Sequence, residues 1–126
     1  MLEGDFKTLV ENANGGESVE WTTTDYTSGY IYADGKGTAL KTSSGWNSYQ
    51  NVPAGSGDNG FSALPAGYRF TDGTTFYNEG NYAHFWSSTQ YDGTNAYNLR
   101  LHYSTTYAYL SRHNKAYGFS VRCLKD

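Results

Sequence analysis

The chain has 126 residues, which suits one domain with a single core, and its formal net charge is −3. Its nine Lys and Arg residues are scattered, so we find no basic stripe of the kind that nucleic-acid binding requires. Hydrophobic residues make up only 37% of the chain but aromatic residues reach 17%, with thirteen tyrosines. Tyrosine buries its ring and keeps a hydroxyl for a partner, so this composition is typical of a recognition protein.

No apolar run approaches the length of a membrane span, so we expect no membrane insertion by this chain. The start at Met1 has neither a basic segment nor an apolar segment of a signal peptide. If the natural protein is exported, we expect its targeting segment to be absent from this chain. Cys123 is the single cysteine, which excludes an intramolecular disulfide and a metal–thiolate cluster.

The first predicted element is a short helix over Phe6–Ala13. Its apolar residues recur at helical spacing and are Phe6, Leu9, Val10 and Ala13. Asp5 is expected to cap the N-terminus, and Gly15–Gly16 to end the helix with a left-handed residue. From Glu20 onward, frequent glycines predict short β-strands and loops. The best candidates for tight turns are Asp34-Gly35, Asp72-Gly73 and Asp92-Gly93.

The last third of the chain predicts three neighbouring antiparallel strands. The first covers Tyr97–Tyr103, where apolar Leu99 and Leu101 alternate with polar residues that would face outward, namely Asn98, Arg100 and His102. After a turn at 104–106, the second strand has Ala108 and Leu110 inward. Its outward residues are Tyr107, Tyr109 and Ser111. The third strand would place Phe119, Val121 and Cys123 on one face. We expect Trp86 and Phe119 to be buried.

Enzymatic and metal chemistry find little support in the residue pattern. The spacing of His84, His102 and His113 matches no zinc motif, so surface histidines are expected. Asp58-Asn59 and Asp92 could hold a loop calcium, but turns account for these residues more simply. Oxidase chemistry of the formylglycine-generating type requires reactive cysteines, and the chain has one. We therefore expect no metal, no cofactor and no catalytic site.

Three ordered motifs stand out in the chain, namely residues 60–69 (GFSALPAGYR), 85–89 (FWSST) and 118–123 (GFSVRC). Together with Leu40-Lys41 and Gly45-Trp46 at matching positions upstream, they resemble the Fibrobacter succinogenes major paralogous domain. The resemblance implies an exported bacterial protein, often a lipoprotein. It also implies an α+β fold of the C-type-lectin-like kind, in which a loop-rich sheet presents a ligand face. The family's N-terminal stretch with its Cys-Pro-x-Gly-Trp motif is missing, which puts a disulfide to Cys123 in doubt.

The region after Trp86 is also similar to the variable regions of proteins diversified by retroelements. Asn, Tyr, Asp and His codons interconvert at one first-position base, and this region is rich in those four residues. We predict one C-type-lectin-like domain over residues 1–126 that binds ligand through its C-terminal half. The candidate ligand-binding residues are Tyr91, Asp92, Asn95, Asn98, Arg100, His102, Tyr103, Tyr107, Tyr109, Ser111, His113 and Asn114. Of these, Tyr107 and Tyr109 are expected to contribute most affinity.

The predicted function is therefore a receptor-like or adhesin-like binding domain at a cell surface, outside the cell or on a phage particle. Its partner would be a protein or glycan on another cell or surface. An alternative is a structural surface or fibre-tip module whose tyrosines pack between subunits. A weaker alternative is an enzyme of the formylglycine-generating type. Under the binding hypothesis, the outward side chains contribute little to folding.

Overall fold

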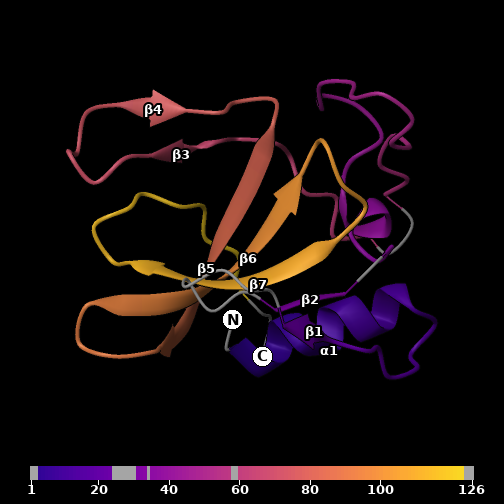
Figure 1. Ribbon diagram of the computed structural model, residues 1–126, viewed down its shortest axis with the longest axis horizontal. Coiled ribbons are helices and arrows are strands. Elements are labelled where there is room, and N and C mark those ends of the chain that lie inside the picture. Colours follow the sequence, from indigo (N-terminus) through magenta and orange to yellow (C-terminus); the bar gives the residue numbers. More distant parts are fainter. Residues whose placement is uncertain (1–2, 24–30, 34, 58–59, 124–126) are drawn as a thin grey trace.

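The computed structural model describes residues 3–23, 31–33, 35–57 and 60–123. These residues form an α+β fold with one helix, α1 (Glu3–Ala13), and a 3₁₀ turn, η1 (Thr38–Leu40). The main sheet has the order β1-β2-β7-β6-β5, and β3 and β4 form a separate hairpin (Figure 1). The strands are β1 (Thr22–Thr23), β2 (Ile31–Ala33), β3 (Tyr68–Arg69), β4 (Phe76–Tyr77), β5 (Tyr82–Gln90), β6 (Asn95–His102) and β7 (Ala108–Asn114). In the described part of the chain, no helix has the length and apolar character needed to cross a membrane.

The N-terminal helix is confirmed, but it begins at Glu3 and not after Asp5. Asp5 therefore lies within the first turn and is not the N-cap. A carboxylate there still interacts favourably with the positive end of the helix dipole. The predicted end is confirmed, because Gly15 and Gly16 both have positive φ (71° and 85°). The turns predicted at Asp72-Gly73 and Asp92-Gly93 join β3 to β4 and β5 to β6, whereas Asp34 lies outside the described residues.

The core lies between α1 and one face of the main sheet, which we call the inner face. Phe6 and Val10 of the helix are fully buried against this face. The sheet contributes alternate residues from its central strands, and Leu40 of η1 closes the core from the side. The buried sheet residues are Ala33, Ala83, Phe85, Leu99, Leu101, Ala108 and Leu110. This alternation agrees with the predicted inward positions of Leu99, Leu101, Ala108 and Leu110.

The opposite, outer face of the sheet is also covered. The β3–β4 hairpin lies on this side, away from α1 (Figure 1), and residues 117–119 pack against it as well. Strands β6 and β7 pair as predicted, with Asn98 opposite Ser111 and Arg100 opposite Tyr109. Asn98 and Ser111 nevertheless have no exposed surface, so the prediction that they face solvent is wrong. Strand alternation identified their face correctly but could not show that other segments cover it.

The third predicted strand is wrong. Residues 118–123 form only isolated bridges, in which Gly118 pairs with Arg69 and Ser120 with Phe85. Val121 is 67% exposed and Cys123 is also exposed, so neither faces inward. The reason is that β7 already has a partner on each side, β6 and β2, and offers no edge to a further strand. The C-terminal segment instead runs between β3 and β5.

Trp86 and Phe119 are only partly buried, contrary to the prediction. Their rings pack on each other with centroids 4.4 Å apart. Trp86 is the next residue after His84 on the outer face of β5, and both Trp86 and Phe119 keep part of their surface exposed to solvent. Both residues belong to the layer on the outer face of the main sheet and not to the aliphatic core on its inner face.

Candidate functional site

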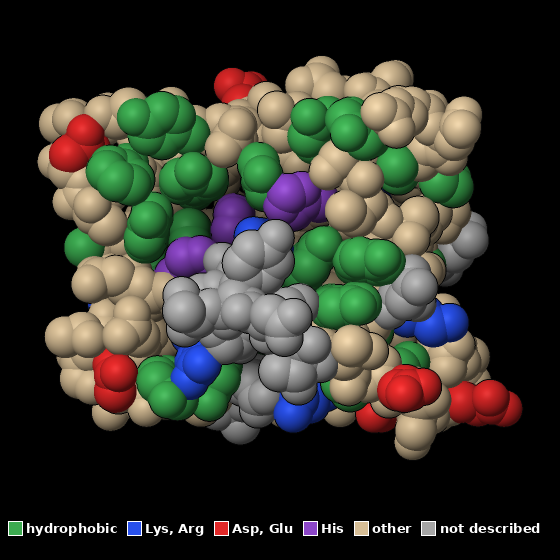
Figure 2. Space-filling model, viewed as in Figure 1, with side chains coloured by type: hydrophobic (Ala, Val, Ile, Leu, Met, Phe, Trp, Pro, Cys, Tyr) green, Lys and Arg blue, Asp and Glu red, His purple; other side chains and the backbone are tan. Residues whose placement is uncertain are grey.

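A pocket on the outer face brings aromatic, imidazole and guanidinium groups together. Its volume is about 220 Å³. We call it the histidine pocket, and it is lined by Tyr68, Tyr82, His84, Arg100, His113, Tyr117 and Phe119. In the space-filling view, histidine side chains gather near the middle of the molecule beside a basic side chain and several hydrophobic ones (Figure 2).

The floor of the histidine pocket is made by strands β5, β6 and β7. Successive side chains in a strand point to opposite faces, so Tyr82 and His84 lie on the outer face while Ala83 and Phe85 lie in the core. The strand register places His84 directly beside Arg100, and Arg100 beside Tyr109. The sheet therefore positions the central charge of the site on its most extensively paired strand.

The wall of the pocket comes from two segments that are tied to each other. Arg69 and Gly118 exchange two backbone hydrogen bonds of 2.9 Å, which join the β3–β4 hairpin to the C-terminal segment. A Cβ atom on Gly118 would lie 2.8 Å from the Cβ of Arg69, so glycine permits this close approach. The junction places Tyr68, Tyr117 and Phe119 over the sheet.

The rings of the pocket form a continuous network. His84 stacks on Phe119 with ring centroids 4.3 Å apart, and Phe119 stacks in turn on Tyr117 at 5.5 Å. Tyr68 meets His84 edge-on at 5.4 Å, and His113 meets Tyr117 edge-on at 5.5 Å. Stacked and edge-to-face pairs are favourable arrangements of aromatic rings, so the walls of the pocket support each other.

Asn98 holds the two pocket histidines from below. Its side-chain nitrogen lies 2.8 Å from Nδ1 of His113, and its side-chain oxygen lies 3.3 Å from Nδ1 of His84. The same amide nitrogen donates to the carbonyl oxygen of Ser111 at 3.3 Å. An amide nitrogen only donates and an amide oxygen only accepts. This network therefore assigns the ring proton to Nε2 in His113 and to Nδ1 in His84.

Both histidines are neutral at pH 7. Burial lowers the pKa of His84 to about 3 and that of His113 to about 4. The nearby Arg100 guanidinium lowers both values further, because a second positive charge beside it is unfavourable. The Cζ atom of Arg100 lies 4.3 Å from the centre of the Tyr109 ring, which stabilises the cation. Arg100 is thus the one full charge among the seven lining side chains.

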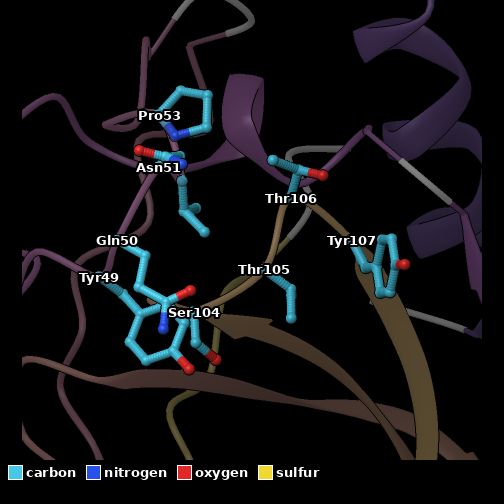
Figure 3. Close-up of a pocket in the computed structure, with 9 residues that line it drawn as sticks. Tyr49, Gln50, Asn51, Pro53, Ser104, Thr105, Thr106 and Tyr107 are labelled. Atoms are coloured by element: carbon cyan, nitrogen blue, oxygen red, sulfur yellow. The ribbon is translucent and has the colours of Figure 1, made fainter.

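A second hollow lies at one end of the sheet, beside the β6–β7 turn. This turn groove has a volume of about 390 Å³ and is lined by Tyr49, Gln50, Asn51, Val52, Pro53, Ser104, Thr105, Thr106 and Tyr107. Figure 3 shows Gln50, Asn51 and Pro53 on one side and Thr105, Thr106 and Tyr107 on the other, with Tyr49 and Ser104 next to each other. None of its lining residues is Asp, Glu, Lys, Arg or His, so this larger hollow offers contact area but no charge.

The turn groove rests on a buried lysine. Lys41 is only 2% exposed, and its Nζ donates to the carbonyl oxygens of His102 and Thr105, the latter at 2.9 Å. Burial lowers the pKa of Lys41 to about 8. The sequence interpretation placed Lys41 in an upstream motif without a role. Its hydrogen bonds to the backbone of His102 and Thr105 show that Lys41 holds the β6–β7 turn in place.

The model of the Fibrobacter succinogenes major domain family matches residues 3–125. The chain belongs to this family. The resemblance inferred from the three motifs is therefore confirmed. No curated protein and no solved structure matches the chain, so the C-type-lectin-like fold and diversification by a retroelement stay predictions.

In this member of the Fibrobacter succinogenes major domain family, the motifs build both the core and the histidine pocket. The first motif supplies Phe61 and Ala63 to the core and Tyr68 to the pocket. The second supplies Phe85 to the core, and the third supplies Phe119 to the pocket. The motif residues therefore bring together segments that are far apart in the sequence.

The predicted site residues divide among three places. Arg100 and His113 line the histidine pocket. His102 and Tyr109 lie next to it, and their ring centroids are 5.7 Å apart. Tyr107 lines the turn groove, whereas Tyr103 lies beside it and meets Tyr49 edge-on at 5.3 Å.

Four of the predicted residues lie at the other end of β6 or beside it, far along the strand from the β6–β7 turn. Tyr91 packs edge-on against Tyr97, and the Cζ of Arg112 lies 4.0 Å from its ring centre. Tyr97 and Arg112 are paired across β6 and β7 on the face opposite the pocket. Asn114 accepts a hydrogen bond from the backbone N–H of Ala116. The four predicted residues Tyr91, Asp92, Asn95 and Asn114 therefore lie in or next to turns at this end of the sheet and do not line the histidine pocket.

Asp92 has a clear structural task. Its carboxylate accepts 2.8 Å hydrogen bonds from the backbone N–H groups of Thr94 and Asn95, which lower its pKa. The alternative of a loop calcium at Asp92 is therefore not needed to explain this residue, and Asp58-Asn59 lie outside the described residues. Within the described ranges, no group of three or more His, Cys, Asp or Glu side chains is placed to hold a metal ion.

The sequence interpretation missed most of the histidine pocket. His84 was expected at the surface but is only 4% exposed. The alternation of Tyr82, His84 and Trp86 with Ala83 and Phe85 could have predicted that these three share a face with Arg100. Tyr68 and Tyr117 had no such pattern, because they come from a very short strand and a turn.

Proposed function

We propose that this chain is a ligand-binding domain of a cell-surface or exported protein, and that its ligand enters the histidine pocket. The observation that carries the proposal is the convergence of Tyr, His, Phe and Arg side chains from four strands and the C-terminal segment on one small hollow. Ligand pockets are typically lined by aromatic side chains with a few polar or charged groups that fix orientation.

The rigidity of the pocket supports binding more than catalysis. Its histidines are held by Asn98 and by stacking, and their low pKa values leave them poor general acids or bases at neutral pH. A prearranged set of rings loses little side-chain entropy when a ligand binds. We therefore propose a binding role and no enzymatic activity, the formylglycine-generating alternative included.

The hypothesis of a diversified surface requires a smaller set of positions than the sequence suggested. Asn98 and Ser111 are fully buried, and random replacement there would break the support of the pocket. Tyr103, Tyr107, Tyr109 and His102 are partly exposed and border the two hollows. We propose that any variation in binding specificity lies in these four residues.

The test is a screen of the purified domain on arrays of glycans and peptides. The pocket variant is Tyr117→Ser, which removes one wall and leaves the Asn98 side chain with its hydrogen-bond partners His84, His113 and Ser111. A matched control is Tyr91→Ser, since Tyr91 is 49% exposed and lies away from the pocket. We expect array signals that are lost in Tyr117→Ser and kept in Tyr91→Ser. Signals that persist in Tyr117→Ser but vanish in Tyr107→Ser would move the site to the turn groove.

One observation favours the structural-module alternative. The β3–β4 hairpin exposes Phe76 at 77%, Tyr77 at 46% and Phe70 at 39%. Exposed aromatic groups of this kind often mark a contact with another protein. Light scattering of the parent and of Phe76→Ser distinguishes the two proposals. An oligomer in the parent that dissociates in the variant supports the structural module, and a monomer in both supports ligand binding at the pocket.

A further inference from the structure

The turn groove, which shares no lining residue with the histidine pocket, has polar but uncharged walls. Its volume of about 390 Å³ lies within the roughly 300–1,000 Å³ typical of pockets for small molecules. The amides of Gln50 and Asn51 lie on one side of the groove and the hydroxyls of Thr105 and Thr106 on the other (Figure 3). Amide groups and hydroxyls both donate and accept hydrogen bonds. The groove is therefore suited to a ligand whose own polar groups are uncharged and do both.

Both walls of the turn groove are held by the fold itself. On one side, the hydrogen bonds of Lys41 hold the β6–β7 turn. On the other side, the backbone N–H of Val52 donates to the carbonyl oxygen of Tyr49 at 3.0 Å, and Gln50 between them has a φ of 42°. Residues other than glycine rarely adopt positive φ, and those that do are frequent at ligand sites. A groove with prearranged walls loses little entropy when a ligand binds.

One hydroxyl of the lining has no hydrogen bond within the protein. The Oγ1 atom of Thr105 is buried and has no partner among the residues that the structure describes. Buried polar atoms without a partner are rare and unfavourable, so this one requires an explanation. Rotation about the χ1 bond of Thr105 can turn the hydroxyl toward a ligand in the groove, and the rotation breaks no hydrogen bond. A ligand with a hydroxyl would supply the missing partner.

Two tyrosine rings border the polar lining. Tyr49 is 38% exposed and meets Tyr103 edge-on, with ring centroids 5.3 Å apart. Tyr107, on the other side, stacks on Tyr32 at 4.6 Å. Because each ring is held by a neighbouring ring, both offer apolar contact area at low entropic cost. A pyranose ring is complementary to such a lining, since its hydroxyls lie around its rim and its C–H groups on its faces.

Two other ligand classes fit the turn groove less well. A charged ligand finds no ion pair there, because no Asp, Glu, Lys, Arg or His lines the groove. An extended peptide that binds by adding a strand requires an unpaired strand edge. The walls of the groove are residues 49–53 and 104–107, which belong to no strand of the fold. An uncharged saccharide meets neither obstacle.

We propose that the turn groove is a second binding site of this domain and takes an uncharged saccharide of one or two pyranose rings. The sugar hydroxyls bond to the amides of Gln50 and Asn51 and to the hydroxyl of Thr105, and one sugar face lies against the ring of Tyr49. Binding requires no calcium ion, because the groove has no carboxylate to hold one. The inference goes beyond the proposed function, which concerns the histidine pocket.

The test titrates the isotope-labelled chain by NMR with cellobiose, maltose, the acidic disaccharide digalacturonate and a hexaproline peptide that is blocked at both ends. We expect at least one neutral disaccharide to shift the backbone signals of Gln50, Asn51 and Thr105 and to bind at least about threefold tighter than digalacturonate. EDTA should leave its affinity unchanged. Failure of both neutral disaccharides overturns the inference, and so does tighter binding of digalacturonate or of hexaproline.

Paired variants locate the bound disaccharide. Tyr49→Ala should weaken its binding by about tenfold or more. Tyr91→Ala is the matched control and should leave the affinity unchanged, because Tyr91 is also exposed and also meets a tyrosine edge-on, but at the other end of β6. Thr105→Val should weaken binding by about threefold or more without lowering the melting temperature, since the hydroxyl has no partner within the described chain. Unchanged affinity in both Tyr49→Ala and Thr105→Val overturns the inference.

A last variant separates this inference from the proposed function. Tyr117→Ser alters the histidine pocket and should leave the affinity for the neutral disaccharide as it is in the parent. Disaccharide binding that is lost in Tyr117→Ser and kept in Tyr49→Ala overturns the inference. That result would place the saccharide in the histidine pocket and would support the proposed function.

Discussion

The two faces of the main sheet are both covered, but by different chemistry. The inner face buries Leu99, Leu101 and Leu110 against α1, and these three side chains have no polar atoms that require a partner. The outer face is covered by rings, imidazoles and a guanidinium, with Asn98 bonded beneath them. Aliphatic packing gains free energy without directional contacts. Polar packing requires every group to find a partner, so it gains less stability but creates a shaped and charged pocket.

The largest expected effect lies on the inner face. Leu99→Ala removes a fully buried side chain, and we expect it to lower the free energy of unfolding by about 2–5 kcal/mol. Val121→Ala is the control and should change it by no more than about 0.5 kcal/mol, since Val121 is 67% exposed. Chemical denaturation of the three proteins measures both. A loss at Leu99 no larger than at Val121 would show that the inner face is not the core.

On the outer face, Asn98→Ala should lower the free energy of unfolding by about 1–3 kcal/mol, because it leaves buried partners without hydrogen bonds. It should also broaden the NMR signals of His84 and His113. Asn51→Ala, at an exposed position of the turn groove, should stay within about 0.5 kcal/mol of the parent. An Asn98→Ala domain as stable as the Asn51 variant would show that Asn98 behaves as the solvent-facing residue expected from sequence.

The two faces should also differ in their response to acid. His84 and His113 have pKa values of about 3 and about 4 in the folded chain, below the ordinary value of 6.5. As the pH falls, these histidines therefore take up protons in the unfolded chain before they do so in the folded chain. The stability that the two neutral histidines contribute is fully present above pH 6.5 and is lost as the pH falls toward 4. The lowered pKa values of Asp72 and Asp92 act only below their ordinary 3.8. The loss between pH 6.5 and 4 is thus assigned to histidine.

His113→Gln tests this assignment. Each histidine contributes at most about 1.4 kcal/mol per pH unit to the slope of stability, so the variant should show a flatter dependence between pH 6.5 and 4 than the parent. Urea denaturation at several pH values gives the slope. An identical slope in parent and variant would mean that His113 is not protonated preferentially in the unfolded chain.

The smallest effect on stability is expected in the β3–β4 hairpin, at the exposed residue Phe76. Phe76→Ser should change the free energy of unfolding by no more than about 0.5 kcal/mol, because the side chain is 77% exposed. Thermal unfolding at matched concentration provides the measurement. A clear loss of stability that depends on protein concentration would instead show that Phe76 packs between copies of the chain.

The candidate site shows which structural features the alternation of residues along a strand can predict and which it cannot. The alternation in 97–103 and 108–111 correctly placed Arg100 and Tyr109 on one face and Leu99 and Leu110 on the other. The same pattern indicated that Asn98 was exposed, because alternation distinguishes two faces but not whether solvent reaches them. Tyr68, Tyr117 and Phe119 could not be assigned to the pocket, since long-range bridges bring them there.

The sequence by itself determined the family, the N-terminal helix and the pairing of β6 with β7, because these depend on local motifs and periodicity. Only the tertiary structure showed that the polar outer face of the main sheet is covered by other segments and is not open to solvent. This arrangement depends on the two hydrogen bonds between Arg69 and Gly118 and on the saturated edges of β7. Both features join residues far apart in the chain, and no local sequence pattern specifies which distant segments pair with each other.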